Sequence, residues 1–231
     1  MRSISREARI AGFLYLVLVL LGLFALKYVP DKVFVEGNPA ATTASIGAHQ
    51  MLLRLGIFDE LVAIVVELAV ALALYRLFER VDKVYAALLV ILGGILPIPI
   101  YFTNALNRVA ALLLATGGAY AQAFTPAQRD AMIALFLNLH HYGFLASEIF
   151  AGLWLLPMGV LTYRSGFLPR FLGVWLILAG LAYLVQCYFG FFLPQYGDAL
   201  DKIAFPLELG EIAFMLWLLI MGAKEPRLNR A

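Results

Sequence analysis

Four glutamates stand inside long apolar stretches of this sequence, where a charged side chain is costly. Glu67 lies in one stretch, Glu148 in a second, and Glu208 and Glu211 share a third. A charge near the centre of a lipid bilayer costs about 3 kcal/mol on insertion scales, so such residues usually face a protein interior or a water-filled cavity. Transporters use carboxylates in this setting to coordinate ions or organic cations. The four glutamates are therefore the first candidates for a binding site.

The composition indicates an integral membrane protein. Hydrophobic residues make up 63% of the 231 residues, charged residues make up 14%, and the mean hydropathy is +0.89, which is unusual for a soluble domain of this length. A hydrocarbon core of about 30 Å requires about 20 helical residues. Continuous apolar runs, rather than alternating ones, favour helices over a barrel. We expect one all-α domain, a bundle of six transmembrane helices near residues 10–27, 54–78, 84–106, 130–163, 171–193 and 203–223.

The distribution of lysine and arginine predicts the orientation, because cytoplasmic loops collect these residues. If both termini are cytoplasmic, that face holds most of the 17 basic residues, namely Arg2, Arg6, Arg9, Arg76, Arg80, Lys83, Arg164, Arg170, Lys224, Arg227 and Arg230. The first helix is interpreted as a retained signal anchor, since no convincing cleavage motif follows it. We therefore expect a multi-pass protein with both termini in the cytoplasm.

The polar residues of the spans fall into two layers. Counted at about 1.5 Å per residue from the cytoplasmic helix ends, the four glutamates lie about 16 to 24 Å up. By the same count, a basic rim lies about 34 to 36 Å up, formed by Arg54, Arg108, His140 and His141. Adjacent histidines point to different faces of a helix, so at most one is expected in the site. Glu60 and Glu67 are seven apart and share a face, as do His141 and Glu148. The predicted ligand-binding residues are Glu67, Glu148, Glu208, Glu211, His141, Asn104, Arg54 and Arg108.

Local signals predict where several helices begin, break and end. Asn38 caps a helix that begins at Pro39, and the pattern then runs unbroken to Phe78 except for two glycines. Thr125 and Gln128 form a capping box at the start of the fourth helix. Pro97 and Pro99 should break the third helix at the level of the glutamates. The apolar stretch 109–124 either extends that helix or lies at the membrane interface.

No motif in the sequence identifies a reaction or a cofactor. Cys187 is the single cysteine, which excludes an internal disulfide and a cysteine-rich metal site. Tryptophans and tyrosines are assigned to interface anchoring and packing. The net charge of +2 follows from the orientation bias and requires no nucleic acid. The expected partners are the lipid bilayer and a small molecule or cation; the cofactor and the oligomeric state stay open.

Several segments resemble a known bacterial family, the domain of unknown function 4386. They are Arg9 to Leu16, Asn38 to Leu55, Glu67 ahead of Leu72 to Leu77, and the turn Tyr163 to Gly173 with its Arg164-Ser165-Gly166-Phe167-Leu168-Pro169-Arg170 core. In that family an acidic residue, commonly aspartate, is expected near the position of Glu67, and the glutamate here is a mild departure. The resemblance implies a multi-pass protein of a bacterial plasma or inner membrane and supplies no mechanism.

Three functions from different classes fit these observations. The favoured hypothesis is a transporter-like or sensor-like protein that binds a small ligand or cation in a carboxylate-lined cavity open to the outer face. The second is a metal-dependent intramembrane enzyme in which His141 and Glu148 are candidate metal ligands, although no His-Glu-x-x-His motif is present. The third is a scaffold or partner subunit without chemistry, in which glycines such as Gly152 and Gly180 allow close helix packing.

Overall fold

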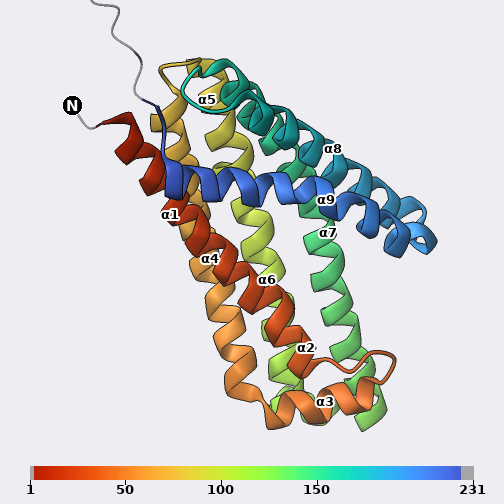
Figure 1. Ribbon diagram of the computed structural model, residues 1–231. Helices are drawn as coiled ribbons and strands as arrows, with labels where there is room; N and C mark the ends of the chain where they lie inside the picture. The colour runs from red at the N-terminus through yellow and green to blue at the C-terminus, as the bar shows by residue number, and fades with distance from the viewer. Residues whose placement is uncertain (1–2, 225–231) are drawn as a thin grey trace, which may run out of the picture. The chain divides into compact units, whose positions relative to one another are not determined.

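The computed structural model describes residues 3–224, without the side chains of Tyr120 and Asp198, and this part of the chain is helical with no strand. Figure 1 shows the elements in chain order. They are α1 (Ile4–Gly22), η1 (Leu23–Tyr28), α2 (Val29–Val33), α3 (Pro39–Ala48), α4 (Gln50–Phe78), α5 (Lys83–Val90), η2 (Ile91–Ile95), α6 (Pro97–Thr116), η3 (Ala119–Ala123), α7 (Pro126–Arg164), α8 (Arg170–Phe192), η4 (Pro194–Tyr196), α9 (Gly197–Leu216) and η5 (Trp217–Met221).

Six helical stretches of this region are long and apolar enough to cross a membrane. They are Ile4–Val33, Gln50–Phe78, Lys83–Thr116, Pro126–Arg164, Arg170–Phe192 and Ala199–Met221. The predicted all-α, multi-pass architecture with six spans is thus confirmed. Most stretches are longer than expected, because the helices continue past the predicted bounds: the first reaches Val33 and the third reaches Thr116.

The two capping predictions are confirmed, but one long helix is broken. Asn38 Oδ1 accepts a hydrogen bond from the backbone N–H of Ala41, and Thr125 and Gln128 form the reciprocal capping box. The expectation of an uninterrupted helix from Pro39 to Phe78 is wrong, because the chain leaves the helix at His49 (φ −115°, ψ 33°).

A side-chain hydrogen bond accompanies this break. The Gln50 side chain donates to the carbonyl of Gly47 at 3.1 Å, which the N–H of Met51 would bond in a continuous helix. The carbonyl of Ser45 keeps its helical bond from the N–H of His49 at 2.9 Å and also lies 3.0 Å from the His49 ring.

The third span follows one of the two alternatives left open by the sequence. Its apolar continuation extends α6 as far as Thr116, and the helix then ends at Gly117, whose φ of +78° favours glycine. Before Pro97 the backbone forms the π-helical turn η2, in which the N–H of Leu96 bonds to the carbonyl of Ile91. The proline break thus changes the helical hydrogen-bond pattern.

The chain divides into two compact units. Unit 1 comprises Met1–Val17, Val66–Pro97 and Leu145–Ala231, and unit 2 comprises Leu18–Val65 and Ile98–Phe144. Each unit is described by itself below. The single domain expected from the sequence stays a prediction.

Close backbone contacts hold α7 and α8 together in unit 1. A Cβ atom added to Gly152 would lie 2.7 Å from the carbonyl oxygen of Gly180, and one added to Gly159 would lie 2.6 Å from that of Gly173. The two glycines of each helix are seven residues apart, so they line one face. Packing of small residues is a main source of helix association in lipid. α8 and α9 also lie side by side (Figure 1).

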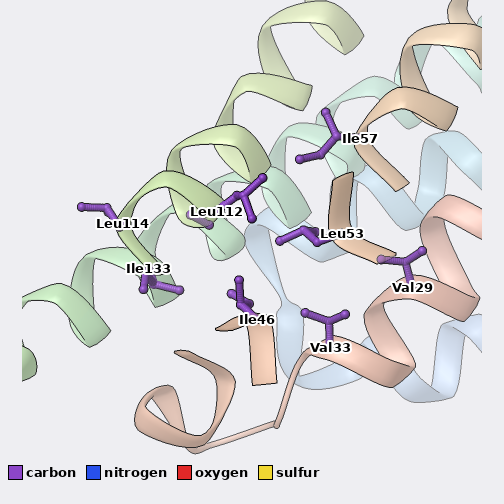
Figure 2. Packing of buried hydrophobic residues seen from close by; sticks show 9 residues of the cluster. Val29, Val33, Ile46, Leu53, Ile57, Leu112, Leu114 and Ile133 are labelled. Carbon is purple, nitrogen blue, oxygen red and sulfur yellow. The ribbon is translucent and has the colours of Figure 1, made fainter. Parts of the chain in front are cut away.

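The core of unit 2 is an apolar cluster that joins five helices. Figure 2 shows its members, which come from α2, α3, α4, α6 and α7. The labelled residues are Val29, Val33, Ile46, Leu53, Ile57, Leu112, Leu114 and Ile133. This cluster fixes the parts of α4, α6 and α7 that carry the polar residues of unit 2.

Candidate functional site

Rows of residues seven apart place the polar side chains on the buried faces of their helices. On α4 the row is Leu53, Glu60, Glu67 and Leu74, and both leucines are fully buried. On α7 the row is Ile133, His140, Ser147, Trp154 and Leu161, all of which are buried. A heptad row keeps to one side of a helix. Glu60, Glu67 and His140 therefore occupy positions that apolar residues fill elsewhere along the same helices.

Glu211 is the centre of one polar cluster in unit 1. Tyr15, which is only 2% exposed, donates its hydroxyl hydrogen to Oε1 of Glu211, and Tyr183 donates to Oε2 at 3.2 Å. Glu67 interacts electrostatically with Glu211. The ring of Trp154 packs against Tyr15 with centroids 5.7 Å apart, and its buried Nε1 has no hydrogen-bond partner within the described part of the chain. Two tyrosines thus fix a carboxylate whose charge no described basic side chain neutralises.

A second cluster in unit 1 contains Glu148 and Glu208. Glu148 interacts electrostatically with Glu208 and with Asp201. Gln186 on α8 donates to Oδ1 of Asp201 at 3.1 Å. Three buried oxygen atoms, Oε2 of Glu148, Oε1 of Glu208 and Oε1 of Gln186, have no hydrogen-bond partner among residues 3–224. Such oxygen atoms can accept a hydrogen bond or bind a cation.

Tyr183 connects these two clusters. Besides its hydrogen bond to Glu211, its hydroxyl interacts electrostatically with Glu208 and Glu148. Glu208 and Glu211 are also three residues apart and so neighbours on α9. The predicted residues Glu67, Glu148, Glu208 and Glu211 therefore belong to one connected set of carboxylates in unit 1.

A buried ion-pair cluster lies in unit 2. Arg108 is 1% exposed; its Nη1 atom lies 2.6 Å from Oε1 of Glu60 and donates to the carbonyl of Ala25 at 2.9 Å. His140 Nε2 lies 3.0 Å from the same Oε1 atom. Asn104 donates to the carbonyl of His140 at 2.9 Å, which ties α6 to α7. The cluster neutralises Glu60 and fills most of the hydrogen-bonding capacity around it.

Two predicted residues of unit 2 lie outside this cluster. Arg54 is exposed on α4, and His141 is exposed on α7 with its ring edge-on to Tyr142. Of the predicted set in this unit, the structure brings together only Arg108 and Asn104. Sequence reasoning did not assign five further polar residues of the two units to the site: Glu60, His140, Tyr15, Tyr183 and Gln186. The heptad rows are the signal that singles out Glu60 and His140, whereas nothing in the local sequence marks Gln186.

A metal site needs several donor side chains close together. Within the described residues, no group of three or more His, Cys, Asp or Glu side chains could hold one. The connected carboxylates of unit 1 can instead share protons or accept the charge of a cationic ligand.

Comparison with known proteins shows to which family this chain belongs. A family model described as Domain of unknown function (DUF4386) matches residues 10–222. The chain belongs to this family. The predicted family is thereby confirmed, and the matched range reaches into all six spans.

Neither the DUF4386 family nor the other comparisons give an activity. An uncharacterized protein of Archaeoglobus fulgidus is 32% identical over 76 residues, which cover 33% of this chain and 44% of that protein. The chain thus spans less than half the length of this relative. No solved structure matches.

Proposed function

We propose that this protein binds a small cation or cationic ligand between Glu148 and Glu208, as part of a transporter or sensor. The observation that carries the proposal is the set of three unpartnered buried oxygens on Glu148, Glu208 and Gln186. Buried acceptors without partners cost about 1 to 3 kcal/mol each, and more when they are charged. A bound cationic ligand would supply positive charge to these acceptors and would offset the repulsion between the two carboxylates.

The surroundings of the site favour a positive ligand. The four glutamates Glu67, Glu148, Glu208 and Glu211 form no ion pair with a described lysine, arginine or histidine. In unit 2, by contrast, Glu60 is neutralised by Arg108 at 2.6 Å. The same helix, α4, therefore carries one paired glutamate and one, Glu67, for which no basic partner is described. An unpaired acidic set inside a membrane segment is the usual signature of an ion or substrate pathway.

The neighbouring cluster would support such a site. Tyr15 and Tyr183 fix the Glu211 carboxylate, and Tyr183 also interacts with Glu208 and Glu148. Binding of a cation at Glu148 and Glu208 would thus change the field at Tyr183 and Glu211. We infer that access is from the outer face, which is the side nearer to these glutamates by the helix count.

We also propose the plasma or inner membrane of a bacterium as the location, with both termini in the cytoplasm. Three contacts bring helix ends together at one end of unit 1: Arg80 pairs with Glu7, the Arg164 guanidinium lies over the Tyr85 ring, and the N–H of Lys224 bonds to the carbonyl of Phe167. The described basic residues of these helix ends are Arg6, Arg9, Arg76, Arg80, Lys83, Arg164, Arg170 and Lys224. Their concentration at one end supports a cytoplasmic position for that end.

One observation favours a second candidate, the scaffold or partner subunit. The contacts of Gly152 with Gly180 and of Gly159 with Gly173 show that close packing is built into α7 and α8. In a scaffold, the glutamates would be protonated and would serve helix association. The two candidates differ in what the loss of a carboxylate would do. A binding protein would lose its ligand, whereas a scaffold would lose stability.

Direct binding separates the two functions. Purified protein would be titrated with radiolabelled sodium and, separately, with radiolabelled tetraethylammonium, and bound label measured by scintillation proximity. We expect saturable binding of at least one probe, weakened about tenfold or more in Glu148→Gln and in Glu208→Gln. Glu36→Gln, which removes an exposed carboxylate, is the matched control and should bind like the wild type. Absence of saturable binding of both probes, or equal binding in all variants, would contradict the proposal.

A further inference from the structure

A groove of about 420 Å³ runs along the start of α1. Its polar end is lined by Ser3, Ser5, Arg6 and Arg9, and its apolar part includes Ile10 and Phe13. All of these residues belong to the first segment of unit 1 and none belongs to the carboxylate clusters. The groove therefore combines two cations and two hydroxyl groups with an apolar floor on one helix.

The charges of the two arginines at the polar end are not neutralised by a described acidic side chain. Glu7, the acidic residue between them in sequence, pairs with Arg80 instead. Both arginines are exposed, and neither forms an ion pair with a described carboxylate. At helical spacing, residues three apart are neighbours on the surface. The guanidinium groups of Arg6 and Arg9 thus form a double positive charge on one face of α1.

Contacts with the end of the last span hold Arg9 in place. Its Nη2 atom donates to the carbonyl of Ile220 at 3.4 Å. Gly222, at φ +69°, follows η5, and a Cβ atom there would overlap Ser5 and lie 3.4 Å from Nε of Arg9. A guanidinium has five N–H donors, so one contact leaves most of them free to bind an anion. The backbone near Gly222 thus holds Arg9 in place and leaves most of its N–H donors available.

The apolar part of the groove is exposed in the way that a lipid-facing surface requires. Phe13 is 57% exposed and Ile10 is 38% exposed. From Arg6 to Phe13 the helix rises by roughly 10 Å. This matches the change from a charged headgroup region to acyl chains over a similar depth of a bilayer. A soluble anion would need the arginines but would gain nothing from this surface.

We propose that this groove binds an anionic glycerophospholipid. The phosphate lies between Arg6 and Arg9, the hydroxyls of Ser3 and Ser5 donate to headgroup oxygens, and one acyl chain follows Ile10 and Phe13. Two cations without an acidic partner among residues 3–224 favour a lipid with net negative charge over a zwitterionic one, because the zwitterion brings its own cation into the site. The bound lipid would bridge α1 and the end of η5 through Arg9.

Native mass spectrometry of the full chain tests this site. The detergent-solubilised protein would be titrated with dioleoyl phosphatidylglycerol, with dioleoyl phosphatidylcholine and with glycerol 1-phosphate. The test variant is Arg6→Gln/Arg9→Gln. The control, Lys83→Gln/Arg170→Gln, removes the same charge from exposed residues at the same end of unit 1. Both pairs of residues are exposed, so neither variant is expected to disturb folding; unchanged thermal unfolding would verify this.

The expected result is discrete binding of phosphatidylglycerol that weakens roughly thirtyfold in the test variant and less than about threefold in the control. Phosphatidylcholine should bind more weakly than phosphatidylglycerol, and Phe13→Ser should weaken phosphatidylglycerol binding. Equal binding of the two lipids, equal losses in both double variants, or displacement of the lipid by glycerol 1-phosphate at similar concentration would overturn the proposal. The last result would indicate a site for a free phosphate monoester.

Discussion

Tyr15 on α1 donates a hydrogen bond to Glu211 on α9, which joins the first and last membrane-spanning segments across 196 positions of sequence. Tyr183 on α8 supplies a second donor to the same carboxylate at 3.2 Å. Three helices of unit 1 therefore meet at one acidic side chain. Hydrogen bonds of this kind are a main source of specificity between helices in lipid, where burial of apolar surface does not favour one helix partner over another.

Removal of one donor should weaken this junction measurably. Tyr15→Phe keeps the ring packed against Trp154 and deletes only the hydroxyl that Glu211 accepts. We expect a loss of about 1 to 2 kcal/mol in the free energy of unfolding, measured by denaturant titration in mixed micelles. Tyr188→Phe is the control, because Tyr188 is 56% exposed. Equal stability of the two variants would show that the hydroxyl contributes nothing.

The glycine contacts predict opposite effects for two alanine substitutions. In Gly180→Ala, the new methyl group would meet the carbonyl oxygen of Gly152 at 2.7 Å, so α7 and α8 must separate, at a cost of about 1 to 3 kcal/mol. In Gly47→Ala, no atom outside the helix lies within 4 Å, and alanine should stabilise α3 by up to about 1 kcal/mol. Unfolding midpoints of the two variants provide the comparison. Similar shifts of the same sign would contradict the close approach.

A double-mutant cycle can measure the ion pair between Glu60 and Arg108. Glu60→Gln leaves a buried guanidinium without a carboxylate, and Arg108→Gln leaves Glu60 with His140 alone, so each should cost about 3 kcal/mol. The double variant should cost less than the sum by about 0.5 to 3 kcal/mol. The pair Lys27 and Asp31, which is exposed, gives the reference cycle with a coupling below about 1 kcal/mol. Additivity within error at Glu60 and Arg108 would refute the coupling.

The orientation of the chain can be measured with single cysteines. In a Cys187→Ser background, Ala44→Cys places a thiol on exposed α3, and Lys83→Cys places one at the start of α5; α4 lies between them in sequence. With cytoplasmic termini, a membrane-impermeant maleimide added to intact cells should label Ala44→Cys, and Lys83→Cys only after lysis. The reverse pattern would invert the proposed topology.

The fold could be predicted where local chemistry decides it. Six apolar runs of sufficient length gave the spans, and the caps at Asn38 and Thr125 gave helix starts, because both signals act within a few residues. The break at His49 could not be predicted in this way. It coincides with the side-chain bond from Gln50 to the carbonyl of Gly47, a contact that has no periodic signature.

The site could be predicted only in part. A charged residue stands out within an apolar run, and so the sequence predicts Glu67, Glu148, Glu208 and Glu211 as site residues. Tyr15 and Tyr183 were assigned to interface anchoring, because a tyrosine in a membrane helix gives the same signal whether its hydroxyl meets water or a carboxylate. That His140 rather than His141 is buried follows from the apolar row on α7, which extends through Ile133 and Leu161.

The glycine contacts between α7 and α8 also limit how unit 1 can move. Helices in backbone contact cannot slide without a clash, so Glu148 on α7 and Gln186 on α8 travel together as parts of one rigid hairpin. Glu208 belongs to α9, which continues into η5, and η5 is held close to α1 where a Cβ atom on Gly12 would meet the backbone of Leu219. An opening of the carboxylate site would therefore be a rotation of α9 away from α8 about that end, and it would have to break the hydrogen bonds that α8 donates to α9, from Tyr183 to Glu211 and from Gln186 to Asp201.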